Sequence, residues 1–413
     1  MAAKTIVVLG GGVGGMVAAN KLRARLRSEH RVVLIERNVE HAFAPSFLWV
    51  MTGDRRPKQV RCPLAHLLRP GIEVVYASAE GLDFEARRVL TTRGELPFDY
   101  LIVALGAELA PELIPGAVES SYGFYTLDGA ARLHEALGRF AGGSIAVIVA
   151  AMPYKCPGAP HEAAMLIADY FRKRGLAPKV DIHLYTPESQ PMPVAGPELG
   201  KAVLQLLENR DIHFHPTHNL VAIDCVARSA RFKQGTLESC DLFVVIPPHR
   251  APRLTRDAGL TNEAGWVPVK ASTLETSHER VFAIGDVTTI PIPGRWRPEI
   301  PLLLPKAGVF AHVQAQVVAD EIAADMEGRK PTQSFCGDGY CMLEAGEDLA
   351  GFAYGNFFAE PSPQISLRRV GKPWHLGKVL LEKWWLSTPG WKREVYGAAL
   401  NVGSRIYGVP LMI

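Results

Sequence analysis

A glycine-rich loop near the start of the chain constrains its fold more than any other feature. An apolar run over residues 5–9 has the character of a buried strand, and apolar residues recur at helical spacing over 16–26. Between them, Gly10, Gly12 and Gly15 have the spacing of a dinucleotide-binding loop. In such a loop the first glycine permits the tight turn, the second lets a pyrophosphate approach, and the third lets the helix pack on the strand. The sequence therefore predicts a Rossmann-like nucleotide site.

Three further segments support this site and indicate its ligand. A second apolar strand, 31–35, is followed by Glu36, which is placed to hydrogen-bond a ribose hydroxyl. Segments 100–106 and 281–286 each read as a strand that ends in a glycine turn. They resemble the fingerprints of flavoproteins with two dinucleotide-binding domains, and this resemblance implies that Asp286 hydrogen-bonds the ribityl chain. The expected ligand is FAD rather than NAD; as an alternative, Asp286 only caps a turn.

The strand–loop–helix unit of a second predicted domain departs from the glycine pattern. Its strand is expected over 144–149 and its helix over 161–174. The loop between them carries three prolines and one cysteine, Pro153, Cys156, Pro157 and Pro160. Because proline lacks the backbone N–H that would bind phosphate, we expect this loop to reject NAD(P)H and to hold a thiol beside a helix start. The alternative is a buried, inert cysteine.

Length and composition indicate an ordinary folded protein of several domains. The chain has 413 residues, 48% of them hydrophobic and 21% charged, and its net charge of +3 is too small to indicate nucleic acid as a partner. The predicted fold class is α/β, with two Rossmann-like domains of the glutathione-reductase type and a C-terminal helical segment. The expected domains are an FAD-binding domain over 1–110 and 265–330, a second Rossmann-like domain over 111–264, and a C-terminal domain over 331–413. We expect no signal peptide and no transmembrane helix.

Five short segments give the chain a specific family resemblance, which extends from Ile6 to about Phe358. They are 45–50, 155–160, 265–269, 304–310 and 339–344. Through them the sequence resembles sulfide:quinone oxidoreductases and the related flavocytochrome c sulfide dehydrogenases. The second group attaches FAD through a cysteine, but the matching region 41–50 has none. We therefore expect FAD to be bound non-covalently.

The resemblance also implies the residues of the site. Family members carry a redox-active cysteine pair near the flavin, and Cys156 and Cys341 fall on those two positions. Cys336 lies five residues earlier and is the rival for the second position. Lys306, at the start of a helix expected over 307–324, matches a family lysine near flavin and quinone, where its charge and the helix N-terminus would stabilise reduced flavin. A solvated Lys306 is the alternative.

The residues predicted to bind the cofactor form one set. They are Gly10, Gly12, Gly15, Glu36, Pro45, Gly106, Gly285, Asp286 and Lys306. His161 and Glu162, one turn beyond Cys156, are weaker candidates for a proton relay. As alternatives, His161 faces water and Glu162 only favours the helix N-terminus electrostatically. His213, His215 and His218 lack a fourth ligand at suitable spacing, so no metal site is expected. Cys62, Cys225 and Cys240 are interpreted as structural.

The C-terminal segment changes in composition from Arg368 onward. Trp374, Trp384, Trp385 and Trp391 occur among five basic residues, Lys372, Lys378, Lys383, Lys392 and Arg393. Leu376, Val379, Leu380 and Trp384 are spaced for one helix face, and helical pieces meet at Pro389–Gly390. Aromatic and basic residues together indicate an interfacial membrane segment on a peripheral protein, with the cytoplasmic face favoured. A dimer or domain interface is the alternative.

The reaction that follows from the resemblance is oxidation of hydrogen sulfide to zero-valent sulfur or polysulfide. Sulfide attacks a Cys156–Cys341 disulfide, or a sulfur-bridged form, and Cys341 leaves as a thiolate that passes two electrons to FAD and then to a quinone. The helix start and Lys155 are expected to favour the thiolate form of Cys156. The alternatives are a type II NADH:quinone oxidoreductase and a non-catalytic flavin or thiol redox sensor.

Overall fold

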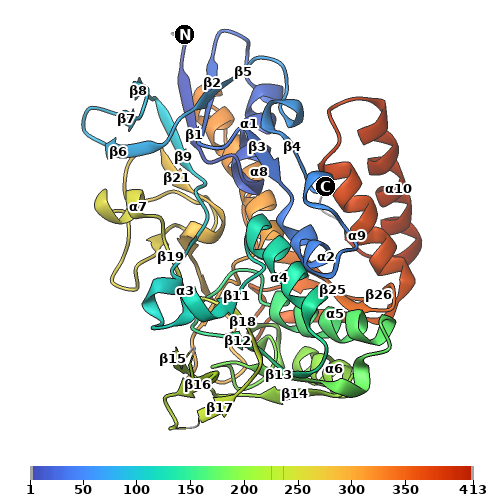
Figure 1. Cartoon of the computed structure of the whole chain (residues 1–413). Coiled ribbons are helices and arrows are strands. Elements are labelled where there is room, and N and C mark those ends of the chain that lie inside the picture. The colour runs from blue at the N-terminus through green and yellow to red at the C-terminus, as the bar shows by residue number, and fades with distance from the viewer. Residues whose placement is uncertain (1–2, 225, 236, 411–413) are drawn as a thin grey trace.

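The structure is a computed structural model that describes residues 3–224, 226–235 and 237–410 (Figure 1). Its first sheet has five parallel strands in the order β21-β9-β1-β2-β5. The strands are β1 (Thr5–Leu9), β2 (Arg31–Glu36), β5 (Ile72–Tyr76), β9 (Tyr100–Val103) and β21 (Val281–Ala283). The apolar run of β1 is buried because helices α1 (Val13–Arg25) and α8 (Gly308–Glu327) and other segments cover the sheet.

A second sheet has the order β11-β18-β12-β13-β14, again with parallel neighbours. Its strands are β11 (Ser121–Tyr122), β12 (Gly143–Val149), β13 (Val180–Tyr185), β14 (Ile212–His215) and β18 (Leu242–Ile246). Helices α4 (Leu127–Arg139), α5 (Ala159–Lys173) and α6 (Pro197–Glu208) share one core with it. A meander of β15 (Leu220–Asp224), β16 (Ser229–Phe232) and β17 (Leu237–Ser239) packs against the other face. These two sheets agree with the predicted pair of Rossmann-like units.

The predicted helices are present, with shifted ends. Helix α5 begins at Ala159, two residues before the expected start, because Pro160 fits the first helical turn, where its missing N–H costs no hydrogen bond. Helix α8 continues three residues beyond Ala324 and ends at Gly328, whose left-handed conformation closes the last turn.

Shorter elements connect the main sheets. They are β3 (Glu40–Ala42), α2 (Phe47–Thr52), β4 (Arg61–Pro63), β6 (Ala79–Asp83), β7 (Arg88–Thr91), β8 (Gly94–Pro97), β10 (Glu108–Leu109), α3 (Ala117–Ser120), β19 (His249–Arg250), α7 (Arg253–Asp257), β20 (Val267–Pro268), β22 (Thr288–Thr289), β23 (Pro291–Ile292) and β24 (Leu302–Leu303).

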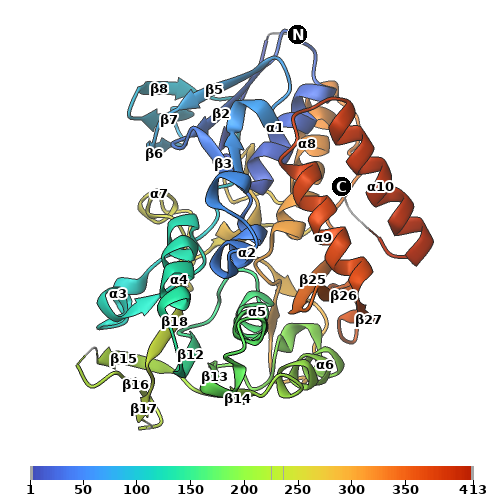
Figure 2. The same cartoon turned by 45° about the vertical axis from the view of Figure 1, so that its right-hand side comes forward.

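The C-terminal part combines an antiparallel sheet with a helical hairpin. Strands β25 (Asp338–Gly346), β26 (Leu349–Asn356) and β27 (Gln364–Gly371) pair in chain order. Helices α9 (Lys372–Trp385) and α10 (Trp391–Tyr407) then lie antiparallel along one side of the molecule, with α10 outermost (Figure 2). Within the described residues, no helix has both the length and the apolar character needed to cross a lipid bilayer.

Candidate active site

The first glycine loop joins β1 to α1 in a conformation that requires glycine at two positions. Gly10 has a φ of +98°, and a Cβ atom there would lie 2.6 Å from the carbonyl oxygen of Ala104. A Cβ atom on Gly15 would lie 1.8 Å from the carbonyl oxygen of Gly10, so Gly15 permits the helix to pack on the loop. Gly12 differs, because a Cβ atom there meets no protein atom within 4 Å. The open side of Gly12 faces a cavity.

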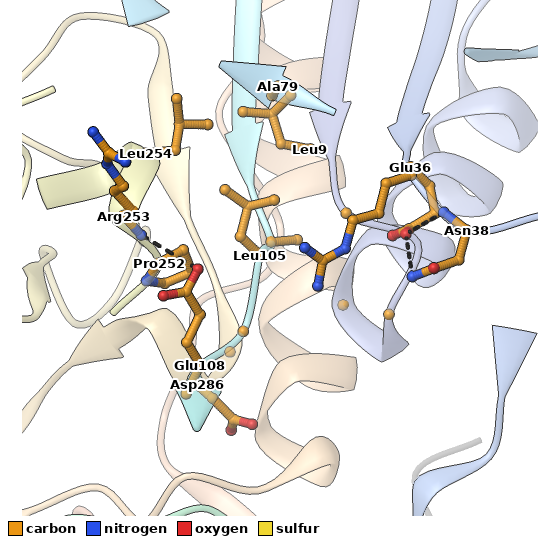
Figure 3. Close-up of a pocket in the computed structure, with 18 of the residues that line it drawn as sticks. Leu9, Glu36, Asn38, Ala79, Leu105, Glu108, Pro252, Arg253, Leu254 and Asp286 are labelled. Carbon is orange, nitrogen blue, oxygen red and sulfur yellow. Dashed lines mark hydrogen bonds between the residues drawn. The ribbon is translucent and has the colours of Figure 1, made fainter. Parts of the chain in front are cut away.

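This cavity has a volume of about 1060 Å³ and extends from Glu36 to Asp286. At one end, Glu36 accepts hydrogen bonds from the backbone N–H of Gly11 (2.7 Å) and of Asn38 (2.9 Å). Figure 3 shows Glu36 and Asp286 entering the cavity from different elements. Gly106 and Gly285 line it between them, at turns after β9 and β21. Both ends of the cavity are therefore polar and joined by glycine-rich backbone.

Asp286 carries a direct sign of a missing polar partner. Its Oδ1 atom is buried and receives no hydrogen bond from the described residues. Burial raises the pKa of Asp286, and Lys155 and Lys306 oppose that rise. Since buried polar atoms are almost always paired, this oxygen fits a hydroxyl donor of a ligand in the cavity. An elongated ligand with a ribose near Glu36, phosphates at the loop and a polyol near Asp286 fits these residues.

Three predicted cofactor residues lie outside the lining of this cavity, and one of them, Lys306, lines the cysteine cavity described below. Gly15 is inside α1, where it allows close packing, and Pro45 lies in a 3₁₀ turn (Ala44–Ser46). A direct contact between Pro45 and a cofactor stays a prediction.

The second loop places Cys156 in an unusual backbone conformation. Its φ is +56°, in the left-handed region that costs energy for a residue with a side chain. The loop is fixed by a backbone hydrogen bond of 2.6 Å from Cys156 N–H to the carbonyl of Lys306, and Ala159 N–H donates to the carbonyl of Cys156 at 2.9 Å. The thiol is thus held at the start of α5 by a segment about 150 residues later in the chain.

Cys156 and Cys341 line one apolar cavity of about 330 Å³. Gly158 makes this arrangement possible, because a Cβ atom there would lie 2.8 Å from Leu343 and 3.6 Å from the sulfur of Cys341. Cys336 lies elsewhere: it is exposed, and its sulfur donates to Asp338 at 3.1 Å. Between the two rivals for the second position, the structure brings only Cys341 to Cys156.

The expectation that the helix start and Lys155 favour the thiolate form of Cys156 was wrong for the reduced protein. The side chain of Cys156 is exposed to the cavity, but surrounding protein removes it from bulk water. Burial and the nearby Glu162 carboxylate raise the pKa of Cys156 to about 12, and Lys378 only partly opposes them. Burial, followed by Glu162, also raises the pKa of Cys341. The start of α5 and Lys155 do not compensate, so reduced Cys156 is a protonated thiol at neutral pH.

A buried network of charged residues adjoins the cysteines, and its contacts could not be predicted from the sequence. The ammonium group of Lys378, on α9, donates to Glu162 on α5 and to the carbonyl of Met342. Glu162 also accepts from the N–H of Glu344 at 2.9 Å, and Glu344 bonds the ring of His375 at 2.8 Å. Burial acts to lower the pKa of Lys378, but Glu162 and Glu344 outweigh it and raise that pKa.

Two other candidates differ from their expected environments. His161 is buried, which excludes the alternative in which it faces water, and burial lowers its pKa to about 4. Lys306 is buried as well, and its ammonium group donates to the carbonyls of Asp286 and Thr288, each at 2.8 Å, and lies over the Trp266 ring. Burial lowers the pKa of Lys306 to about 8. Its alternative as a solvated lysine is thereby excluded, and its role at a flavin stays a prediction.

The other described cysteines and the three histidines considered as metal ligands are not in the lining of this cavity. Cys62 is partly buried and Cys240 buried, while Cys225 lies outside the described residues. His213 and His215 are on β14, and the rings of His183 and His215 stack. In the described part of the chain, no three side chains of the metal-binding types are arranged to hold an ion.

The C-terminal hairpin has a polar buried side and an apolar exposed one. Lys378 and Glu382 of α9 face inward, and Glu382 accepts hydrogen bonds from Ser46 and Arg55. Counting Lys378 among the membrane-facing cations was therefore wrong. On α10 an exposed apolar stripe recurs at helical spacing; its members are Trp391, Val395, Val402 and Ile406, each more than half exposed.

Comparisons with known proteins agree with this geometry. Residues 4–313 match the family model described as pyridine nucleotide-disulphide oxidoreductase. The chain is 28% identical to a sulfide-quinone reductase of Aquifex aeolicus over 93% of this chain and 90% of that protein. It is 26% identical to the mitochondrial sulfide:quinone oxidoreductase of Mus musculus over 86% of this chain and 79% of that one. The crystal structure of the Aquifex aeolicus sulfide:quinone oxidoreductase superposes with a TM-score of 0.84 and 26% identity, covering 100% of this chain and 96% of that one.

Proposed function

The chain belongs to the pyridine nucleotide-disulphide oxidoreductase family, and we propose that it oxidises sulfide and passes the electrons through a flavin to a quinone. The observation that carries the proposal is the placement of Cys156 and Cys341 on one apolar cavity. The names of the relatives from Aquifex aeolicus and Mus musculus support the same reaction. The product is zero-valent sulfur, released as polysulfide or passed to an acceptor.

The flavin is FAD, bound without a covalent link. Glu36 is placed for the adenosine ribose, the amides around Gly12 for the pyrophosphate, and Asp286 for the ribityl chain. Bound flavin supplies a two-electron acceptor beside the thiols. The absence of a cysteine from 41–50 supports non-covalent binding.

The two cysteines carry the sulfur chemistry. In the oxidised enzyme they form a disulfide or a sulfur-bridged link. Sulfide attacks Cys156, the new S–S bond makes a persulfide, and Cys341 leaves with the electron pair as a thiolate. Burial and Glu162 raise the pKa of Cys341, and the Lys378 ammonium partly opposes them, so Lys378 is the group that favours the thiolate form of this leaving group. Further sulfide lengthens the persulfide until sulfur is released.

NADH is not expected to replace sulfide as the electron donor. In the second loop, Pro153, Pro157 and Pro160 provide no N–H groups, and Cys156 N–H is already bonded to Lys306. A pyrophosphate approaching this loop would therefore find few of the donors that bind it at Gly10–Gly15. This distinguishes the proposal from the NADH:quinone alternative.

The quinone is collected at a membrane surface through the C-terminal hairpin. The exposed stripe of α10 would enter the lipid interface, and Lys392 and Arg405 lie on the same helix. This helix lies on the outside of the molecule (Figure 2), where a membrane can reach it. The protein then acts as a peripheral membrane protein.

An anaerobic titration tests the proposed function. Sulfide added to the purified flavoprotein should bleach the oxidised flavin spectrum, and a short-chain quinone should restore it. Bleaching by NADH but not by sulfide would overturn the proposal in favour of an NADH:quinone oxidoreductase. Sedimentation with anionic liposomes tests the membrane part, and Val402→Glu and Ile406→Glu should weaken binding by about 10-fold.

A further inference from the structure

One buried carboxyl group of the cysteine cavity has no part in the reaction described so far. Glu188 is 6% exposed and lines the same cavity as Cys156 and Cys341. Among the described lining residues it is the only carboxylic acid, and the others are nearly all apolar. It lies two residues beyond Thr186, just after β13. A lone acid in the apolar cavity that also holds the reacting sulfur atoms requires a chemical or structural explanation.

The surroundings of Glu188 hold it in place and leave one oxygen without a hydrogen bond from the described residues. Its Oε2 atom accepts from the hydroxyls of Tyr154 (2.9 Å) and Thr186 (3.1 Å). Its backbone N–H donates to Thr186, and its carbonyl accepts from the N–H of Thr217. Within the described part of the chain, the Oε1 atom accepts no such hydrogen bond, and it is not fully enclosed by protein. Since Glu188 lines the cavity, Oε1 is available to a small molecule there.

Burial raises the pKa of Glu188 to about 7, against the hydrogen bonds from Tyr154 and Thr186 that lower it. The titratable groups that face it come from several elements: Tyr154 and Cys156 on the loop, Tyr125 behind the loop, Lys306 on the 301–307 segment, and Tyr340 and Cys341 on β25. Lys306, with its pKa lowered by burial to about 8, also titrates in this range, but its ammonium group donates to the carbonyls of Asp286 and Thr288. Glu188 is therefore the carboxylate of this set that can accept a proton near neutral pH.

We propose that Glu188 is the base that accepts the proton of hydrogen sulfide as its sulfur attacks Cys156. This inference rests on the proposed function. The S–H bond of hydrogen sulfide breaks and its proton goes to Glu188; the S–S bond to Cys156 forms; and the bond to Cys341 breaks, with the electron pair leaving on Cys341 as a thiolate. One hydrogen sulfide, one disulfide and one carboxylate give one persulfide, one thiolate and one carboxylic acid.

The chemistry of the cavity explains why a base is needed at this point. Neutral hydrogen sulfide enters an apolar cavity more readily than its anion, because the anion would lose its hydration. The neutral molecule is the weaker nucleophile, so attack is faster if its proton is removed during the reaction. Hydrogen sulfide loses its first proton near neutral pH, which is also where Glu188 titrates.

The pH profile of sulfide-driven flavin reduction tests the inference in the holoenzyme. With ionised Glu188 and neutral hydrogen sulfide as reactants, the wild-type rate constant is bell-shaped, with its maximum near neutral pH. Glu188→Gln keeps the shape and hydrogen bonds of the side chain but cannot accept the proton. Its rate at pH 7 should fall about 100-fold, and its profile should rise with pH to a plateau. A variant that keeps the wild-type rate at pH 7 would overturn the inference.

A second variant changes the pKa of Glu188 but keeps its carboxyl group. Tyr154→Phe deletes a hydrogen bond that lowers the pKa of Glu188. The acidic limb of the bell should therefore move to higher pH, while the limb set by hydrogen sulfide stays in place. A uniform fall in rate without movement of the acidic limb would assign the Tyr154–Glu188 pair to holding the loop and would contradict the proposal.

A nucleophile that carries no proton shows whether Glu188 acts as a base or only positions other groups. At pH 8.5 sulfite should also attack the disulfide and release Cys341 as a thiolate. The rate of this reaction is measured from the thiolate–flavin charge-transfer absorbance. Glu188→Gln should slow the sulfide reaction at pH 7 while leaving the sulfite reaction within about threefold of wild type. Equal losses with both nucleophiles would overturn the inference. Failure of sulfide to bleach the wild-type flavin would instead overturn the proposed function, and this inference with it.

Discussion

The two strand–loop–helix units of this molecule occupy the same position in two similar domains but differ in chemistry. After β1, Gly10 and Gly12 keep the backbone open to a cavity that runs to Asp286. After β12, the loop that carries Cys156 contains three prolines, and the backbone N–H of Cys156 donates to the carbonyl of Lys306. The first loop exposes backbone donors, whereas the second fixes one side chain. The fold therefore supplies a position, and the loop residues decide what is bound there.

The largest expected effect comes from removing the thiol of the second loop. Cys156→Ser should lower sulfide-driven flavin reduction by at least about 1,000-fold, because serine cannot form the disulfide that sulfide attacks. Cys341→Ser should do the same, and both variants should keep their flavin. Stopped-flow absorbance measures the rates. Cys336→Ser is the matched control, since its sulfur lies outside the cavity; a large loss in the control would assign the second position to Cys336.

The two loops should also differ in their response to NADH. At equal concentrations, NADH should reduce the flavin at least about 100-fold more slowly than sulfide, because the second loop offers few N–H donors to a pyrophosphate. Anaerobic stopped-flow traces with each donor give the ratio. Comparable rates would show that the prolines do not exclude a nicotinamide cofactor.

A smaller effect is expected when the first loop gains a side chain. Gly12→Val should weaken flavin binding by about 10-fold or more, since the new side chain occupies the cavity where the phosphates bind. The fold should remain, because a Cβ atom at Gly12 meets no protein atom within 4 Å. The flavin-to-protein ratio after dialysis measures the effect. Gly403→Val, also in open space but on α10, should keep its flavin.

The smallest effect concerns the charge beside the second loop. Glu162 raises the pKa of Cys156, so Glu162→Gln removes an anion and leaves Lys378 to favour the thiolate. The pKa of Cys156 should therefore fall, and alkylation of the reduced protein at pH 8 should become about fivefold faster. Peptide mass mapping of Cys156 after iodoacetamide treatment gives the rate. Slower alkylation would contradict this assignment, and Glu198→Gln, an exposed carboxylate of α6, should change nothing.

Local sequence patterns predicted the parts of the site that lie within one loop. The spacing of Gly10, Gly12 and Gly15, the acid at Glu36 and the prolines around Cys156 all act through nearby backbone, so they can be read directly. The pairs that cross the chain could not be predicted. Lys378 and Glu162 are 216 positions apart, and Lys378 was read as a surface cation because its neighbours are aromatic and basic.

The pKa of Cys156 also depends on residues that are distant in the chain. A helix start and an adjacent lysine favour a thiolate when only local residues are considered. The structure adds enclosure by protein and the Glu162 carboxylate, and the pKa rises to about 12. Glu188 could not be singled out from the sequence, because its contact with Tyr154 depends on how the loop folds back on β13.

The sequence by itself determined the two nucleotide-type units, because glycine, proline and apolar periodicity act over a few residues. It also determined, through resemblance, the family of the reaction. Only the tertiary structure decided which cysteine meets Cys156, which acids enter the cavity and what charge they carry. Those properties depend on desolvation and on contacts between residues distant in the chain, and both arise only when the domains pack together.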